Sequence, residues 1–98
     1  MIPNVSVHEE ATEELGNAAK WYDEHLSGLG KDFTDEVEKV MEFVCSFPEA
    51  APKTRGGARK RILHRFPYNI IYRIMPDKIR ILAIAHQKRR PFYWRGRK

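Results

Sequence analysis

The apolar residues of this chain change their spacing near residue 58, and this change indicates the fold class. Between residues 9 and 47 they recur every three or four positions, as on one face of a helix, whereas residues 59–85 follow the shorter repeat of β-strands. At 98 residues the chain has room for one modest core. We therefore expect one α+β domain, residues 1–98, with two helices before most of the strands.

The first half predicts a short strand and a pair of helices. Residues 2–7 alternate weakly, and residues 6–9 have the S-x-x-E spacing of a capping box. A first amphipathic helix should follow from residue 9 to about residue 26, and a second should carry the apolar stripe of residues 33–47. Two glycines in the segment 27–30 can adopt positive φ and reverse the chain. The helices should therefore form an antiparallel hairpin.

The second half predicts an antiparallel meander. Residues 49–58 contain Pro and Gly and should form a connector. Three segments rich in β-branched and aromatic residues follow, namely Arg59 to Phe66, Asn69 to Met75 and Lys78 to Ala85. Because the turns between them are short, these strands should pair in sequence, and the N-terminal strand can join them. We expect a β-α-α-β-β-β order, with the helix hairpin packed on one face of a small antiparallel sheet.

The charges are divided between the two halves of the chain. Residues 1–50 hold 3 Lys or Arg against 12 Asp or Glu, a formal charge of −9, whereas residues 51–98 hold 15 against 1, a formal charge of +14. A basic half of this strength favours a polyanion or an acidic protein as partner, although charged residues also form ordinary solvated surfaces.

Several classes of function are disfavoured. The sequence has no long apolar segment and no signal-peptide pattern, so we expect a cytoplasmic protein without a membrane partner. Gly28 and Gly30 precede a helix but lack the strand and the G-K-[ST] motif of a phosphate-binding loop. The four histidines are far apart, so we expect neither a metal ion nor a cofactor. Cys45 should be a packing residue near the end of the second helix.

The basic residues suggest a surface for binding the target. Strand alternation predicts Arg59, Arg61 and Arg65 on one side of a strand, and this side would be a concave cationic surface if the helices left it uncovered. The aromatic run 92–94 would either stack on bases beside arginines or pack the C-terminal segment onto the domain. The candidate target-binding residues are Arg59, Arg61, Arg65, Arg73, Lys88, Arg90 and Trp94.

A smaller set of residues has the chemistry for cleaving RNA without a metal ion. Such cleavage needs a base for the 2′-hydroxyl, cations for the charged transition state and an acid for the leaving oxygen. Lys60, His86, Arg89 and Tyr93 are of suitable types, although spacing alone does not bring them together. For His86 the alternative is a histidine at a strand end whose ring is hydrogen-bonded locally.

Several stretches of the chain, taken in order, resemble the RelE/ParE superfamily of bacterial toxins from type II toxin–antitoxin modules. They are Ala18 to Tyr22, Gly28 to Gly30, Phe66 to Arg73, Ile81 to His86 and Arg89 to Trp94. The resemblance spans nearly the whole chain and implies a two-helix hairpin on an antiparallel sheet. It further implies growth inhibition, plasmid stabilization and a small cognate antitoxin that masks the active surface in a hetero-oligomer.

The resemblance implies one of two targets. RelE-like toxins cut messenger RNA on the ribosome, whereas ParE-like toxins poison DNA gyrase. By this resemblance Lys60 lies near a RelE-type catalytic lysine, Arg89 near a late-strand arginine, and Tyr93 can replace a terminal tyrosine. Asn69 and Ile62, however, stand near positions where relatives have basic residues. We therefore expect ParE-like gyrase poisoning, with RelE-like cleavage as the first alternative and a non-toxic RNA-binding module as the second.

Overall fold

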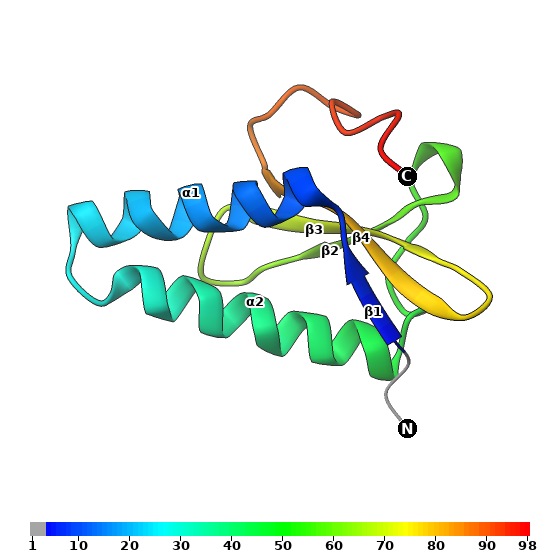
Figure 1. Ribbon diagram of the computed structural model, residues 1–98, viewed down its shortest axis with the longest axis horizontal. Helices are drawn as coiled ribbons and strands as arrows, with labels where there is room; N and C mark the ends of the chain where they lie inside the picture. Colours follow the sequence, from blue (N-terminus) through cyan, green and yellow to red (C-terminus); the bar gives the residue numbers. More distant parts are fainter. Residues whose placement is uncertain (1–3) are drawn as a thin grey trace.

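A four-stranded sheet organises the computed structural model, which describes residues 4–98. Its strands, in the spatial order β1-β4-β3-β2, are β1 (Asn4–Val7), β2 (Arg59–Ile62), β3 (Tyr68–Ile74) and β4 (Lys78–His86). The predicted α+β class and the predicted order of elements are confirmed (Figure 1). Residues 2–3 of the expected N-terminal strand lie outside the described residues.

The sheet is mixed rather than wholly antiparallel. β2, β3 and β4 form the predicted antiparallel meander, but β1 pairs with β4 in parallel, with Val5 opposite Ile79. A tight turn imposes antiparallel pairing on its two strands, whereas β1 is joined to the rest of the sheet through both helices. The long connection leaves the direction of β1 free to differ.

The two helices form the predicted antiparallel hairpin. α1 (Glu9–His25) and α2 (Leu29–Ser46) lie together on one side of the sheet (Figure 1). Gly28 has a φ of 89°, as expected for the reversal. Gly30 differs from the prediction, because it lies inside α2, where a Cβ would be 2.4 Å from the main-chain oxygen of Ala19. No helix in the described part of the chain is long and apolar enough to span a membrane.

The N-terminus of α1 is capped by a residue outside the predicted capping box. His8 is the N-cap, and its Nδ1 accepts a hydrogen bond from the main-chain N–H of Glu10 at 3.0 Å. Ser6 lies in β1 and its Oγ accepts a hydrogen bond from Arg80. The capping-box prediction is wrong because β1 extends through Val7, which keeps the Ser6 side chain away from the helix.

β2 is shorter than predicted, whereas β3 and β4 agree with the prediction to within one residue. The carboxylate of Glu36 on α2 accepts the main-chain N–H groups of His64 at 2.6 Å and Arg65 at 3.1 Å. These donors therefore bind a helix side chain instead of extending the strand. The expected continuation of the strand to Phe66 is wrong for this reason.

Apolar side chains pack against both faces of the sheet. The cluster on the helix side includes Phe33 of α2 with Ile70 and Tyr72 of β3. The cluster on the opposite face includes Leu82 and Trp94, which is only 7% exposed. The C-terminal segment, residues 87–98, crosses this second face (Figure 1). The run 92–94 therefore packs the C-terminal segment onto the domain, which was one of the two arrangements expected.

Candidate functional site

The four candidate catalytic residues meet at one small pocket. Lys60 of β2, His86 at the end of β4, and Arg89 and Tyr93 of the C-terminal segment all line it. We call it the Lys60 pocket. Its volume is about 170 Å³, and Arg90 and Trp94 also belong to its wall. The fold thus brings together residues that are 33 positions apart between Lys60 and Tyr93.

Lys60 comes from the face of the sheet that the helices do not cover. It pairs across the sheet with Ile71, which belongs to the cluster opposite the helices. Asn69 also lines the pocket, and its Oδ1 accepts a long hydrogen bond of 3.4 Å from Gln87. Asn69 in turn pairs with Ile62. The two residues that depart from the basic positions implied by the resemblance are therefore direct neighbours in the sheet.

The ring of His86 makes a local hydrogen bond, which was the expected alternative to a catalytic role. Its Nδ1 accepts the main-chain N–H of Lys88 at 3.0 Å, and its ring lies edge-on to Tyr68 with centroids 5.0 Å apart. The imidazole is therefore held at the end of β4 by its own turn and by an aromatic neighbour. This arrangement leaves Nε2 as the ring nitrogen without that hydrogen bond.

Arg89 and Tyr93 contact each other at the pocket wall. The guanidinium carbon of Arg89 lies 3.8 Å from the centroid of the Tyr93 ring, a close cation–π contact. The Tyr93 hydroxyl points away to α1, where it donates a 2.6 Å hydrogen bond to Glu14. Burial and the Glu14 carboxylate raise the pKa of Tyr93 well above its ordinary value of 10.0. Tyr93 therefore stays protonated at neutral pH.

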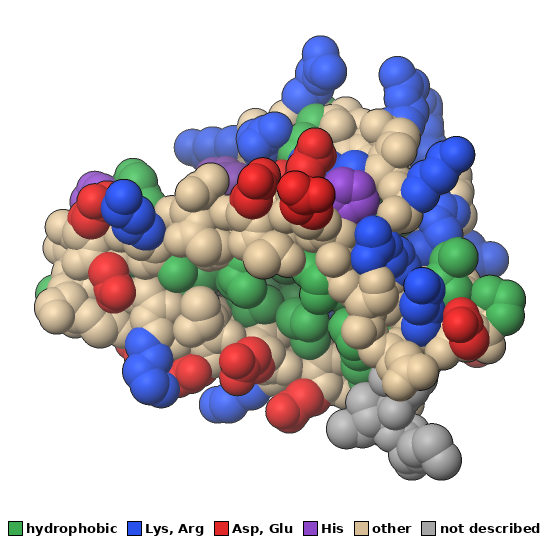
Figure 2. All heavy atoms as spheres, in the orientation of Figure 1, with side chains coloured by type: hydrophobic (Ala, Val, Ile, Leu, Met, Phe, Trp, Pro, Cys, Tyr) green, Lys and Arg blue, Asp and Glu red, His purple; other side chains and the backbone are tan. Residues whose placement is uncertain are grey.

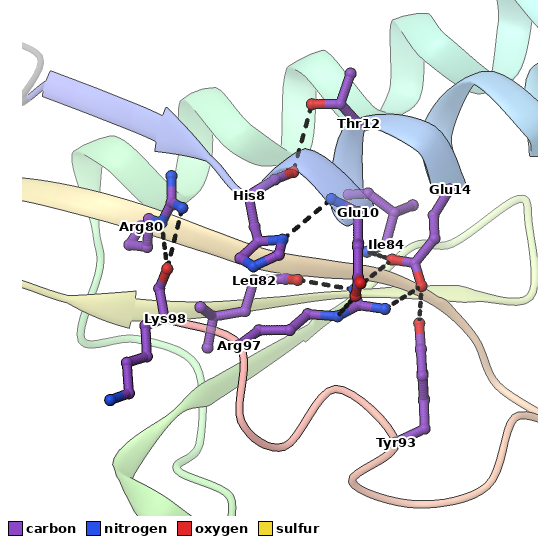
Figure 3. Close-up of polar contacts among 10 residues, drawn as sticks. All are labelled: His8, Glu10, Thr12, Glu14, Arg80, Leu82, Ile84, Tyr93, Arg97 and Lys98. Atoms are coloured by element: carbon purple, nitrogen blue, oxygen red, sulfur yellow. Dashed lines mark hydrogen bonds and ion pairs between the residues drawn. The ribbon is translucent and has the colours of Figure 1, made fainter.

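Glu14 is the residue at this site that the sequence did not reveal. Its two carboxylate oxygens accept hydrogen bonds from the main-chain N–H of Ile84, the Tyr93 hydroxyl and both terminal nitrogens of Arg97 (Figure 3). Arg97 also donates to the carbonyl of Leu82 and forms an ion pair with Glu10. We call Glu14, Tyr93 and Arg97 the Glu14 cluster. It ties the C-terminal segment to α1 and to β4.

The tyrosines should make the protein less stable at alkaline pH. The pKa values of Tyr22, Tyr68, Tyr72 and Tyr93 are all raised, with burial as the largest cause. Above pH 10 the unfolded chain loses these protons while the folded chain retains them, so the free energy of unfolding should fall as pH rises. Each retained proton contributes up to about 1.4 kcal/mol per pH unit. Urea unfolding between pH 7 and 11 measures this fall.

The Tyr93→Phe variant is the control for that experiment. It should be less stable than the wild type at pH 7, because the hydrogen bond to Glu14 is lost, and its stability should fall less steeply above pH 10. Stability that stayed constant through this range would contradict the shielding of these hydroxyls.

The three arginines expected on one side of β2 and its extension do not lie on the sheet face opposite the helices. Arg59 and Arg61 pair with Tyr72 and Ile70, whose side chains belong to the cluster on the helix side. Arg59 donates to the carbonyl of Ala51 at 2.7 Å, and the Arg61 guanidinium stacks 4.2 Å from the Phe43 ring. Arg65 lies 3.6 Å from Asp32. These three arginines therefore do not form a concave cationic surface on a face that the helices leave uncovered.

The remaining candidate target-binding residues divide into three groups. Lys88 and Arg90 are exposed in the turn after β4. Trp94 is buried between the C-terminal segment and the sheet, so its ring is not accessible for stacking. Arg73 of β3 lies on the sheet face opposite the helices, and its Nη1 donates a hydrogen bond to the Gly56 carbonyl.

Among residues 4–98, no three His, Cys, Asp or Glu side chains are grouped so as to hold a metal ion.

Comparisons with known proteins point to one class. The family model described as the ParE toxin of type II toxin–antitoxin systems matches residues 5–91. A chain of the chromosomal ParDE toxin–antitoxin system from P. aeruginosa aligns over 87% of this chain and 96% of its own length, with a TM-score of 0.65 and 19% identity. A mutant of the E. coli toxin RelE in the free state aligns over 90% and 86%, with a TM-score of 0.58 and 18% identity. At these identities the two structures establish a similar fold only. No curated protein sequence matches the chain.

Proposed function

Because the chain belongs to the ParE toxin family of type II toxin–antitoxin systems, we propose that it arrests growth by poisoning DNA gyrase and that a cognate antitoxin neutralises it. The toxin class rests on the family match over residues 5–91, whereas the gyrase target is our proposal. In this proposal the protein works in the cytoplasm, where its target is found.

One observation supports gyrase over messenger RNA as the target: the hydroxyl of Tyr93 is committed to Glu14. A general acid or base must exchange its proton near the working pH, and it must reach the reacting atom. The Tyr93 hydroxyl instead donates inside the protein at 2.6 Å, and its pKa is raised by burial and by Glu14. These features favour a surface that binds a protein target.

The charge and exposure of the surface support an acidic, partly apolar antitoxin. In Figure 2 most acidic side chains lie over the two helices, whereas basic side chains gather over the C-terminal segment and the strands. Large apolar side chains are also exposed on the helix hairpin and just after it, including Trp21 at 54%, Leu26 at 63% and Phe47 at 59%. An antitoxin that covers both kinds of surface would form a hetero-oligomer with the toxin.

Ribosome-dependent cleavage of messenger RNA is the second candidate, and a different observation favours it. Lys60, His86, Arg89 and Tyr93 have the side chains that metal-free RNA cleavage needs, and all four line the same pocket. For Tyr93 to take part, its hydroxyl would have to leave Glu14. The two candidates therefore make different predictions about cellular RNA.

Mapping transcript 5′ ends separates the two candidates. The chain is induced in cells that lack the antitoxin, and 5′ ends are mapped within minutes of growth arrest. We expect arrested cells with intact transcripts and with DNA breaks that depend on gyrase. New 5′ ends inside translated codons would overturn the gyrase proposal and make Lys60, Arg89 and Tyr93 catalytic residues.

The double variant Lys60→Ala, Arg89→Ala should relieve growth arrest. If these two cations contact the target, their removal should weaken binding by about a hundredfold or more, because hydrogen bonds to charged groups contribute about 1.5–3 kcal/mol each. Survival after induction measures the effect. The control is Lys20→Ala, Lys39→Ala, which removes two exposed cations from the helices. Full toxicity in a folded Lys60 and Arg89 double variant would exclude these residues from the target surface.

A further inference from the structure

A second cationic site lies on the same sheet face as the Lys60 pocket, toward the other end of β4. It is a groove of about 610 Å³ lined by Arg73, Lys78, Arg80 and Lys98, with Leu82 contributing an apolar wall. We call it the basic groove. Arg73 comes from β3, Lys78 and Arg80 come from β4, and Lys98 comes from the C-terminal segment. None of the four candidate catalytic residues lines it.

Two arginines face each other across the strands of the groove. Arg73 of β3 is the direct cross-strand partner of Arg80 of β4. Like charges placed directly opposite each other in a sheet are destabilising. The protein nevertheless fixes both side chains: Arg73 donates to the Gly56 carbonyl at 2.6 Å, and Arg80 donates to Ser6 Oγ. Figure 3 shows that Arg80 also donates to the main-chain oxygen of Lys98. The two positive charges of Arg73 and Arg80 are therefore held opposite each other in an ordered part of the structure.

No acidic side chain compensates these charges within the described residues. Arg73, Lys78 and Arg80 are all half-buried, yet none of them forms an ion pair with an Asp or Glu of residues 4–98. Arg97 beside them is different, because Glu10 and Glu14 both pair with it. The main-chain oxygen of Lys98 contacts Arg80 alone, and no carboxylate side chain lies against Arg73 or Lys78 among residues 4–98. These half-buried cations create a positive potential that an anion from outside can neutralise.

The cations continue beyond the groove. A neighbouring cavity of about 120 Å³ shares Arg73 and Arg97 with it and adds Arg55, Arg95 and the Phe92 ring. The Arg55 guanidinium lies 5.4 Å from the centroid of that half-buried ring. The groove and this cavity therefore form a track of basic side chains with an aromatic ring beside it. Regularly spaced phosphates fit such a track, and a base can contact the ring.

We propose that the basic groove binds phosphate groups of a nucleic-acid strand through Arg73, Lys78 and Arg80. Guanidinium groups match phosphate geometry with paired donors, and such backbone contacts position a strand without reading its sequence. An acidic peptide offers carboxylates but no bases for the aromatic ring, so the arrangement favours a nucleic acid. The proposal does not depend on gyrase or the ribosome as the toxin's target.

Fluorescence anisotropy with the purified chain tests the proposal. Two short labelled single-stranded DNA oligonucleotides of unrelated sequence are titrated at several salt concentrations. Arg73→Gln with Arg80→Gln should reduce the salt slope by about 1.4 and weaken binding roughly 25-fold at about 0.1 M salt, equally for both sequences, because each phosphate contact on a single strand contributes about 0.7 to the slope. Lys78→Gln should reduce the slope by about 0.7. Lys78 makes no side-chain hydrogen bond within residues 4–98, so this variant keeps its fold even if the arginine variant does not.

The controls separate the groove from the overall positive charge. Lys20→Gln with Lys39→Gln removes the same net charge from the helices and should leave the salt slope unchanged. The proposal is overturned if the chain does not bind DNA, if the Lys78→Gln slope equals that of the wild type, or if a poly-glutamate of matched charge binds more tightly than DNA. Because neither gyrase nor antitoxin is present, the outcome is independent of the proposed toxin function.

Discussion

Replacing Glu14 with Ala should lower the free energy of unfolding by about 3 kcal/mol, because it breaks a largely buried ion pair and leaves the Arg97 charge paired only with the exposed Glu10. The Arg97 side chain is only 11% exposed and Glu14 itself only 16%. The substitution removes the carboxylate that accepts from Arg97, from the Tyr93 hydroxyl and from the main-chain N–H of Ile84. Urea denaturation at pH 7 measures the loss, which is a large share of the stability of a small domain.

A neighbouring carboxylate provides the matched control. Glu13 is exposed on the same helix, and Glu13→Ala should change stability by no more than about 0.5 kcal/mol. Hydrogen exchange should also become faster at Ile84 in the Glu14→Ala variant, because that N–H loses its acceptor. A Glu14→Ala variant as stable as Glu13→Ala would show that the Glu14 cluster does not hold the C-terminal segment in place.

Gly30→Ala should destabilise the helix hairpin by about 3 kcal/mol, as overpacking of a closed interior does. A Cβ on Gly30 would lie 2.4 Å from the main-chain oxygen of Ala19 and 2.7 Å from the Asp23 carboxyl carbon. It would also disturb the 2.7 Å hydrogen bond from the Gly30 N–H to Asp23. Because one of the clashing atoms belongs to the backbone, the helices must move apart. Thermal unfolding of the variant measures the effect.

A second glycine of the hairpin gives the opposite expectation. Gly16 is exposed in α1, and apart from its chain neighbours and the nearby backbone of α1 no atom lies within 4 Å of the position of its Cβ. Gly16→Ala should therefore stabilise the protein by about 0.5–1 kcal/mol through helix propensity. Equal effects of the two substitutions would contradict the close approach of α1 and α2 at Gly30.

The elements of the fold could be predicted because each depends on local pattern. The apolar repeat identified both helices, and the turns at Pro67 and Pro76 separated the strands of the meander. The direction of β1 could not be predicted, since it depends on packing after a long connection. The early end of β2 depends on Glu36, which is 28 positions from His64 in the sequence. Long-range contacts of single side chains leave no periodic signal.

The candidate site was only partly predictable for the same reason. Residue type selected Lys60, His86, Arg89 and Tyr93, and the structure places them around one pocket. Glu14 appeared in the sequence as one more acidic residue on the polar face of a helix, and its role depends on Tyr93 and Arg97, about 80 positions later. Its position beside the apolar Leu15 and Ala18 was the available signal, but that signal does not identify a partner.

The most direct test of the proposed target is a DNA supercoiling assay with purified gyrase and the purified chain. The proposal predicts that supercoiling is inhibited, that cleaved DNA held by gyrase accumulates, and that Lys60→Ala with Arg89→Ala reduces both effects. Gyrase that supercoils and religates DNA normally in the presence of excess folded protein would contradict the proposal.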